Sequence, residues 1–174
     1  MFRKKIVFLT GTRADYGKLK ALITAVKKIK KFNPIILATG MHMERSYGKT
    51  YIEILKDFSD IKLYKFKNQK KNISMDSVLA NTITSLNKIL RKIKPDLVVV
   101  HGDRIETLAA SIYCNLNNIL IAHIEGGEVS GTVDECIRHA TTKFSHIHFV
   151  SNIKAKKIIQ RLGEVKRNIY LMGS

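Results

Sequence analysis

Short apolar runs alternate with longer amphipathic segments along the chain, and this alternation constrains the fold more than any other feature. Several runs place Ile and Val at consecutive positions, which is typical of strands that are buried on both faces of a sheet. The alternation predicts an α/β fold with a Rossmann-like, doubly wound and mainly parallel sheet. The predicted strands are residues 6–9, 34–38, 61–63, 97–100, 120–124, 147–150 and 169–171. The predicted helices are residues 16–31, 47–58, 75–93, 106–116, 135–144 and 153–162.

The length and composition are those of one globular domain. The chain has 174 residues, 45% of them hydrophobic and 26% charged, which excludes disordered and collagen-like classes. Cys114 and Cys136 show neither metal-ligand spacing nor disulfide density, so we expect no metal and a reducing compartment. The apolar run at residues 6–9 ends without a cleavage signal, and no run approaches the roughly 20 residues of a membrane helix. We therefore expect a cytoplasmic protein with no membrane partner.

The charge is unevenly distributed. The formal net charge is +17, yet residues 103–135 carry six acids and one base, a net −5 against +22 for the remainder. A basic chain suggests nucleic acid, but the lysines are dispersed over many helices and no recognised nucleic-acid motif is present. Those of the first helix, including Lys18, are expected on a solvated face, and the basic segment 65–72 is expected to be a mobile, solvated loop. A nucleic-acid-binding domain remains the alternative of a different class, and steep salt dependence of oligonucleotide binding would favour it.

Functional side chains follow the first two predicted strands, at the sheet edge where ligands of doubly wound folds bind. In the segment at residues 10–17 the glycines are too far apart for GxGxxG, and the charge of Asp15 disfavours a dinucleotide phosphate. Asp15 suits a helix N-cap as well as a site role. Arg13 is well suited to bind phosphate or carboxylate. His42, after the second strand, either contacts a ligand hydroxyl or closes its loop.

The fourth strand is followed by His101-Gly-Asp-Arg104, four residues that favour a site because the glycine permits close approach of a ligand. The structural alternative is that Asp103 caps the next helix while Arg104 pairs with Glu106. After the fifth strand, residues 123–135 hold three glycines, four carboxylates and no lysine. Crowding of like charges is expected to raise the pKa of at least one of these carboxyl groups and so to make a general acid or base. The stretch lacks the calcium-loop pattern of an EF-hand, and Ser130 lacks the GxSxG of a hydrolase.

These motifs resemble the N-terminal half of the hydrolysing UDP-N-acetylglucosamine 2-epimerases of sialic acid synthesis. The matching pieces occur in family order and are Gly11-Thr-Arg-Ala-Asp-Tyr16, His101-Gly-Asp-Arg104, His123-Ile-Glu-Gly-Gly-Glu-Val-Ser-Gly131, and Asp134 through His139 followed by Thr142-Lys143. The resemblance implies a two-domain GT-B-like fold of which residues 1–174 are the N-terminal Rossmann-like domain. The C-terminal UDP-binding domain is then absent from this chain, and Gly173-Ser174 resembles the start of the crossing into it.

The implied reaction eliminates UDP from UDP-N-acetylglucosamine to leave 2-acetamidoglucal, and water then adds to give N-acetylmannosamine without a cofactor. Such chemistry needs a base for the C2 proton, a proton donor and stabilisation of oxocarbenium-like charge. The resemblance assigns this work to Asp103, Glu125 and Asp134 without deciding which is the base. It places Arg13 and Arg104 on the diphosphate or sugar. The remaining residues expected to line or support the substrate site are Asp15, His42, Glu128, Arg138 and His139.

Two related activities remain alternatives, namely nonhydrolysing epimerisation to UDP-N-acetylmannosamine and action on a UDP-2,4-diacetamido sugar. The expected partner is a UDP-sugar, the full-length form is expected to be a homo-oligomer, and the fragment alone is expected to bind UDP weakly and not to turn over. The Gly-Gly-Glu-Val-Ser-Gly and Ile-Arg-His segments resemble the hydrolysing branch.

Overall fold

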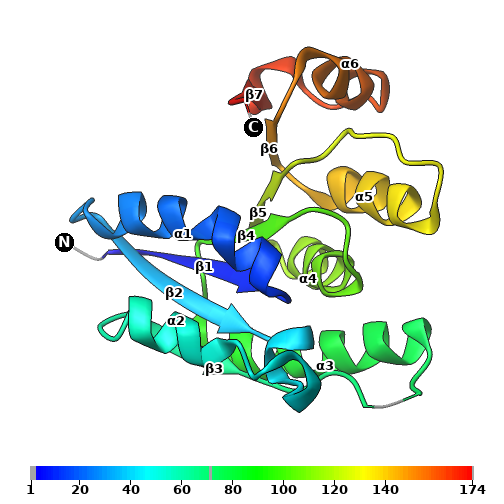
Figure 1. Cartoon of the computed structure of the whole chain (residues 1–174). Helices are drawn as coiled ribbons and strands as arrows, with labels where there is room; N and C mark the ends of the chain where they lie inside the picture. The colour runs from blue at the N-terminus through cyan, green and yellow to red at the C-terminus, as the bar shows by residue number, and fades with distance from the viewer. Residues whose placement is uncertain (1–2, 71, 174) are drawn as a thin grey trace.

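The computed structural model describes residues 3–70 and 72–173, which form an α/β domain around one seven-stranded sheet (Figure 1). The strand order is β3-β2-β1-β4-β5-β6-β7, and every pairing is parallel. This order continues the Rossmann arrangement, in which the chain runs outward from β1 on one side and from β4 on the other. The predicted Rossmann-like fold class is therefore confirmed. Ser174, the second residue of the predicted start of the crossing, lies outside the described residues.

All predicted strands and helices are found, four of them with the predicted bounds and the others with shifted ends. The strands are β1 (Lys4–Thr10), β2 (Phe32–Ala38), β3 (Lys62–Lys65), β4 (Leu97–His101), β5 (Leu120–Ile124), β6 (Ile147–Val150) and β7 (Ile169–Leu171). The helices are α1 (Arg13–Lys27), α2 (Tyr51–Asp57), α3 (Met75–Ile93), α4 (Ile105–Leu116), α5 (Val133–Phe144) and α6 (Ile153–Arg161). Short 3₁₀ turns, η1 (Gly40–Met43), η2 (Arg45–Tyr47) and η3 (Lys166–Asn168), occupy the connections before α2 and β7.

Helix α1 begins three residues earlier than predicted, because Thr12 rather than Asp15 is its N-cap. The Thr12 hydroxyl accepts a hydrogen bond from the Asp15 backbone N–H at 3.2 Å, and the Asp15 carboxylate accepts one from the Thr12 N–H at 3.1 Å. This reciprocal capping box satisfies two N–H groups that the helix itself cannot. Of the two roles left open for Asp15, that of N-cap is wrong by three positions, and its carboxylate also accepts from the Gly11 N–H at the end of β1.

Two apolar clusters cover the two faces of the sheet. On one face, Val7, Leu37 and Val98 pack against helices α3 and α4. On the other face, Phe8 and Ile36 pack against helices α1 and α2. Burial on both faces explains the consecutive apolar positions of the strands.

The order of the strands determines where a site can form. Because β1 and β4 are neighbours whose connections leave in opposite directions, the loops after their carboxyl ends diverge and leave room for a ligand. Those loops hold the residues between β1 and α1 and between β4 and α4. Among the described residues, no helix is both long and apolar enough to span a bilayer.

Candidate functional site

A cleft of about 810 Å³ opens at the carboxyl edge of the sheet, beside the loop that follows β4. Its wall on the β4 side holds Asp103 and Arg104, and the first turn of α5 contributes Asp134. The opposite wall comes from Tyr47 of η2 and Met75 at the start of α3. Three of the predicted site residues, Asp103, Arg104 and Asp134, thus line one cavity.

The sequence left open a purely structural role for the residues after β4, with Asp103 capping α4 and Arg104 paired with Glu106. The structure confirms only half of this alternative. The N-cap of α4 is Arg104, without a side-chain capping bond, so Asp103 does not cap that helix. Asp103 instead forms an ion pair with Arg138 of α5. The other half of that alternative is confirmed, since Arg104 Nε donates to Glu106 Oε2 at 3.2 Å.

Arg138 connects the loops after β4 and β5. Besides its pair with Asp103, its Nη1 donates to the backbone carbonyl of Glu128 at 2.7 Å. The Glu128 carboxylate accepts a hydrogen bond from the Ser151 hydroxyl at 2.7 Å and borders a separate cavity of about 200 Å³ beside α6. Arg138 therefore supports the walls of the cleft from behind, as a buried guanidinium with two acceptors.

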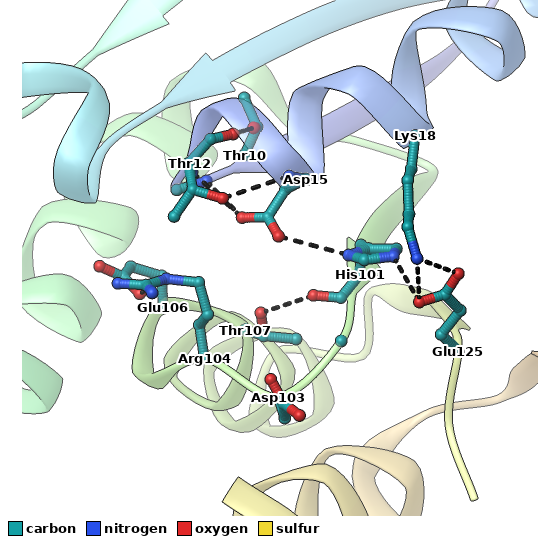
Figure 2. A network of polar contacts seen from close by, with 12 residues as sticks. Thr10, Thr12, Asp15, Lys18, His101, Asp103, Arg104, Glu106, Thr107 and Glu125 are labelled. Atoms are coloured by element: carbon teal, nitrogen blue, oxygen red, sulfur yellow. Dashed lines mark hydrogen bonds and ion pairs between the residues drawn. The ribbon is translucent and has the colours of Figure 1, made fainter. Parts of the chain in front are cut away.

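A chain of polar contacts joins the ends of β1, β4 and β5 (Figure 2). His101 lies between two carboxylates, with Nδ1 3.3 Å from Asp15 Oδ1 and Nε2 3.1 Å from Glu125 Oε2. The second contact has the distance of an ion pair but not the angle of a hydrogen bond, and Nε2 has no hydrogen-bond partner. Lys18 of α1 closes the chain, because its Nζ lies 2.6 and 2.7 Å from the two Glu125 oxygens.

Glu125 adopts an unusual backbone conformation at the end of β5. Its φ is +60°, in the left-handed region that side-chain-bearing residues seldom occupy and that functional sites often impose. Burial raises its pKa, but the hydrogen bonds and positive charge of Lys18, with a contribution from His101, outweigh that effect and lower the pKa below its ordinary value. Glu125 is therefore held as a carboxylate beside the ends of β1 and β4.

The expected rise in carboxyl pKa is not found where the structure resolves a shift in the β5–α5 segment. The Glu135 carboxylate accepts hydrogen bonds from the Ser130 and Gly131 N–H groups at 2.8 and 2.6 Å, and these bonds lower its pKa. Glu125 shifts in the same direction. At these two residues the crowding of acids is compensated by backbone donors and by Lys18 from α1, which the expectation did not count.

The other predicted residues lie in different surroundings. His42 is fully buried, and its two ring nitrogens contact the hydroxyls of Thr10 and Thr50 at 2.9 and 2.7 Å, so it closes its loop. Arg13 is exposed on the first turn of α1 and pairs with Glu53 at 3.1 Å. His139 is half-buried with its Nε2 3.6 Å from Glu135. Neither His42, Arg13 nor His139 lines the 810 Å³ cleft.

A buried histidine fixes the backbone next to Asp103. His123 Nε2 lies 2.8 Å from the Gly102 carbonyl, which can only accept, so this nitrogen carries the proton and Nδ1 accepts from the Thr142 hydroxyl at 3.1 Å. Burial lowers the His123 pKa to about 3, which keeps the ring neutral. An added Cβ at Gly126 would come within 2.9 Å of this ring, so the glycine is required by close approach.

Sequence reasoning missed three residues that the structure places in the site, namely Lys18, Asn68 and Glu106. Lys18 is exposed, as expected, and its side chain also reaches Glu125 across the sheet edge. Asn68 belongs to the segment expected to be a solvated loop, yet it is 2% exposed and bonds the backbone and side chains around it.

No group of three or more His, Cys, Asp or Glu side chains with metal-binding geometry occurs within residues 3–70 and 72–173. Three carboxylates, Glu125, Glu106 and Asp103, are instead paired with Lys18, Arg104 and Arg138 respectively.

Comparison with known sequences identifies a single family. Residues 24–174 match the family described as UDP-N-acetylglucosamine 2-epimerase. A protein of Neisseria meningitidis named UDP-N-acetylglucosamine 2-epimerase is 43% identical over 98% of this chain and 45% of its own length. The UDP-N,N'-diacetylbacillosamine 2-epimerase (hydrolyzing) of Legionella pneumophila is 36% identical over 98% of this chain and 46% of its own length. The chain thus spans just under half the length of these relatives.

Solved structures agree on the fold. A crystal structure of the Neisseria meningitidis UDP-GlcNAc 2-epimerase bound to UDP-GlcNAc superposes with a TM-score of 0.86 at 26% identity, over 98% of this chain and 46% of that one. The Acinetobacter baumannii MurG structure superposes over 87% of this chain and 42% of that one, with a TM-score of 0.65 at 14% identity, a likeness of fold alone.

Proposed function

The chain belongs to the UDP-N-acetylglucosamine 2-epimerase family, and on that premise we propose that it is the N-terminal half of a hydrolysing UDP-sugar 2-epimerase. The preferred reaction converts UDP-N-acetylglucosamine and water into N-acetylmannosamine and UDP. The observation that carries the proposal is the cleft that Asp103 and Asp134 line together, at the β4 edge of the topological switch point. Its carboxylates and flanking cations suit a reaction that moves a proton and expels an anion.

In the first stage a carboxylate removes the C2 proton, the C1–O bond breaks, and UDP leaves with the electron pair. Asp103, Glu125 and Asp134 are the groups proposed to take the proton and to stabilise the developing positive charge at C1. In the second stage water adds its oxygen to C1 of 2-acetamidoglucal while a proton is returned to C2. The left-handed backbone of Glu125 supports its inclusion, because strain of this kind persists only where the surroundings fix the residue.

Cations beside these acids are proposed to serve the leaving group. Arg104 lines the cleft next to Asp103, and Lys18 holds Glu125 in the ionised state. A guanidinium can bind a diphosphate with two parallel hydrogen bonds, so Arg104 is the preferred diphosphate contact. Arg13 pairs with Glu53 and would have to leave it to reach a ligand.

The chain spans just under half the length of its relatives, and this bears on what it is expected to bind. We propose that the other half supplies much of the uridine site, so residues 1–174 alone are expected to bind UDP weakly and to release no N-acetylmannosamine. Release of that sugar by the 174-residue chain would refute this part of the proposal. In a two-domain form, NMR of the products distinguishes free N-acetylmannosamine from UDP-N-acetylmannosamine, the product expected of a nonhydrolysing enzyme.

The Legionella pneumophila relative gives a specific reason to test a second substrate. UDP-2,4-diacetamido sugars should be assayed beside UDP-N-acetylglucosamine in the same two-domain form, and the larger kcat/KM identifies the substrate.

The site itself is tested with Glu125→Gln in that form. Turnover is expected to fall by orders of magnitude while UDP affinity stays nearly unchanged, because the proposed work of Glu125 is on the sugar. Unchanged turnover would remove Glu125 from the proposed catalytic groups.

A further inference from the structure

Glu106 is a buried carboxylate that the proposed reaction does not use. It is the second residue of α4, and only 2% of it is exposed. An ionised carboxylate loses its hydration when buried, and that loss is large unless partners replace it. Such a residue at the floor of a candidate substrate cleft therefore calls for a physical reason.

Both carboxylate oxygens of Glu106 have a partner. Asn68 Nδ2 donates to Oε1 at 3.1 Å, and Arg104 Nε donates to Oε2 at 3.2 Å. Asn68 is itself fixed, because its Oδ1 accepts from the Gly40 N–H at 3.1 Å and its Nδ2 also contacts Thr82. The carboxylate thus joins the segment after β3 to the start of α4.

Two glycines enclose this carboxylate. A Cβ on Gly40 would lie 2.6 Å from Glu106 Oε1, and a Cβ on Gly11 would lie 3.5 Å from the Glu106 carboxyl carbon. The loops after β1 and β2 therefore lie close to Glu106 and restrict the positions of its side chain. The orientation of the Glu106 carboxylate is therefore limited by backbone atoms, which move less than side chains.

The direction of Glu106 decides what Arg104 can do. Arg104 shares the cleft lining with two carboxylates, Asp103 and Asp134, and both attract an unrestrained guanidinium. Glu106 accepts a hydrogen bond from Nε of Arg104, and Asp103 forms its ion pair with Arg138. The terminal Nη1 and Nη2 of Arg104 then have no protein partner among the described residues, and its side chain is 30% exposed.

We propose that Glu106 is a positioning residue that holds the Arg104 guanidinium by its Nε and keeps the two terminal nitrogens free for the diphosphate of the substrate. The inference rests on the proposed function for the identity of the ligand. The affinity for a diphosphate is higher because the guanidinium is already oriented before binding and is not paired with the neighbouring acids. The role needs the fork of arginine, since lysine has no Nε–H to give to Glu106.

The test is a double-mutant cycle read out by binding of inorganic pyrophosphate to the 174-residue chain. Glu106→Gln and Arg104→Met are each expected to weaken binding about tenfold, and the double variant no further, because both changes remove one interaction. Arg104→Lys is expected to lose as much affinity for pyrophosphate as Arg104→Met. Ser111→Ala, a buried hydroxyl on the same helix that bonds the Leu108 carbonyl, is the matched control and should leave binding unchanged.

Several results would overturn the inference. They are additive losses in the double variant, full binding by Arg104→Lys, unchanged binding by Glu106→Gln, or no pyrophosphate binding by the unaltered chain. If Glu106→Gln does not fold, judged by circular dichroism, the Arg104→Lys result decides alone. In a two-domain form, Glu106→Gln should raise KM about tenfold and change kcat less than about twofold. Failure of the proposed function would appear instead as the wrong product with the binding cycle intact.

Discussion

Replacing Gly40 by Ala should destabilise the protein more than a left-handed backbone alone explains. Gly40 has φ +59°, and an alanine there costs about 1–2 kcal/mol for the left-handed conformation. Its Cβ would also lie 2.6 Å from Glu106 Oε1 and 2.8 Å from the Gly11 carbonyl oxygen, both held by surrounding structure. Relieving such overlaps in a packed region adds about 1–3 kcal/mol. The expected loss is therefore about 2–5 kcal/mol, a large part of the roughly 5–15 kcal/mol that stabilises a domain.

The chain supplies the matched control. Gly48 has φ +76° but no atom within 4 Å of an added Cβ, so Gly48→Ala should lose only the backbone share, about 1–2 kcal/mol. Urea unfolding followed by circular dichroism measures both variants, and an unchanged m-value shows that the same surface is exposed. Equal losses at the two glycines would refute the close approach of the β1 and β2 loops to Glu106.

Three further predictions concern charge and burial. Lys18→Met should raise the Glu125 pKa and move the acid limb of the pH–rate profile of a two-domain form to higher pH, whereas Lys20→Met, whose partner is Asp57, should not. Because the folded-state pKa of His123 is lowered to about 3 while the unfolded value stays near ~6.5, its contribution to stability is complete above that value and falls by ~1.4 kcal/mol per pH unit as pH drops toward 3. His123→Gln should make the free energy of unfolding, measured with urea, depend less on pH in that window. An unaltered slope against pH would contradict the lowered pKa of His123. With a thiol reagent, Cys136 should react in the native protein, whereas Cys114, whose pKa burial raises to about 12, should react only on unfolding.

The fold was predictable because its main determinant is local. Strands buried on both faces need consecutive apolar residues, and helices that cover them need one apolar stripe, so both can be recognised within a window of ten to twenty residues. The errors lie at the ends of helices and strands, where one or two hydrogen bonds decide. Thr12 and Asp15 are both good cap residues, and the structure uses both in one capping box, with Thr12 as the N-cap and Asp15 three residues later.

The site was predictable only where its residues follow strands directly. Asp103 and Arg104 come immediately after β4, so the rule for doubly wound sheets suffices to place them at the ligand edge. Lys18 and Asn68 reach the same edge from the second turn of α1 and from the loop after β3. Their composition resembles that of any exposed segment, and their role depends on contacts with residues 107 and 38 positions away. Pairings of that kind are set by the order of the strands.

The charge of the site shows the same dependence on strand order. Residues 103–135 hold six acids and one base, which describes a strongly negative segment when the sequence is read alone. In the folded chain these acids meet cations from outside the segment, because Lys18 of α1 reaches Glu125 and Arg138 of α5 reaches Asp103. Paired acids repel an anionic ligand much less than free ones, since the field of each pair falls off faster than that of a single charge. The carboxylates that the proposed reaction needs can therefore sit beside a diphosphate, and the basic remainder of the chain adds attraction for it.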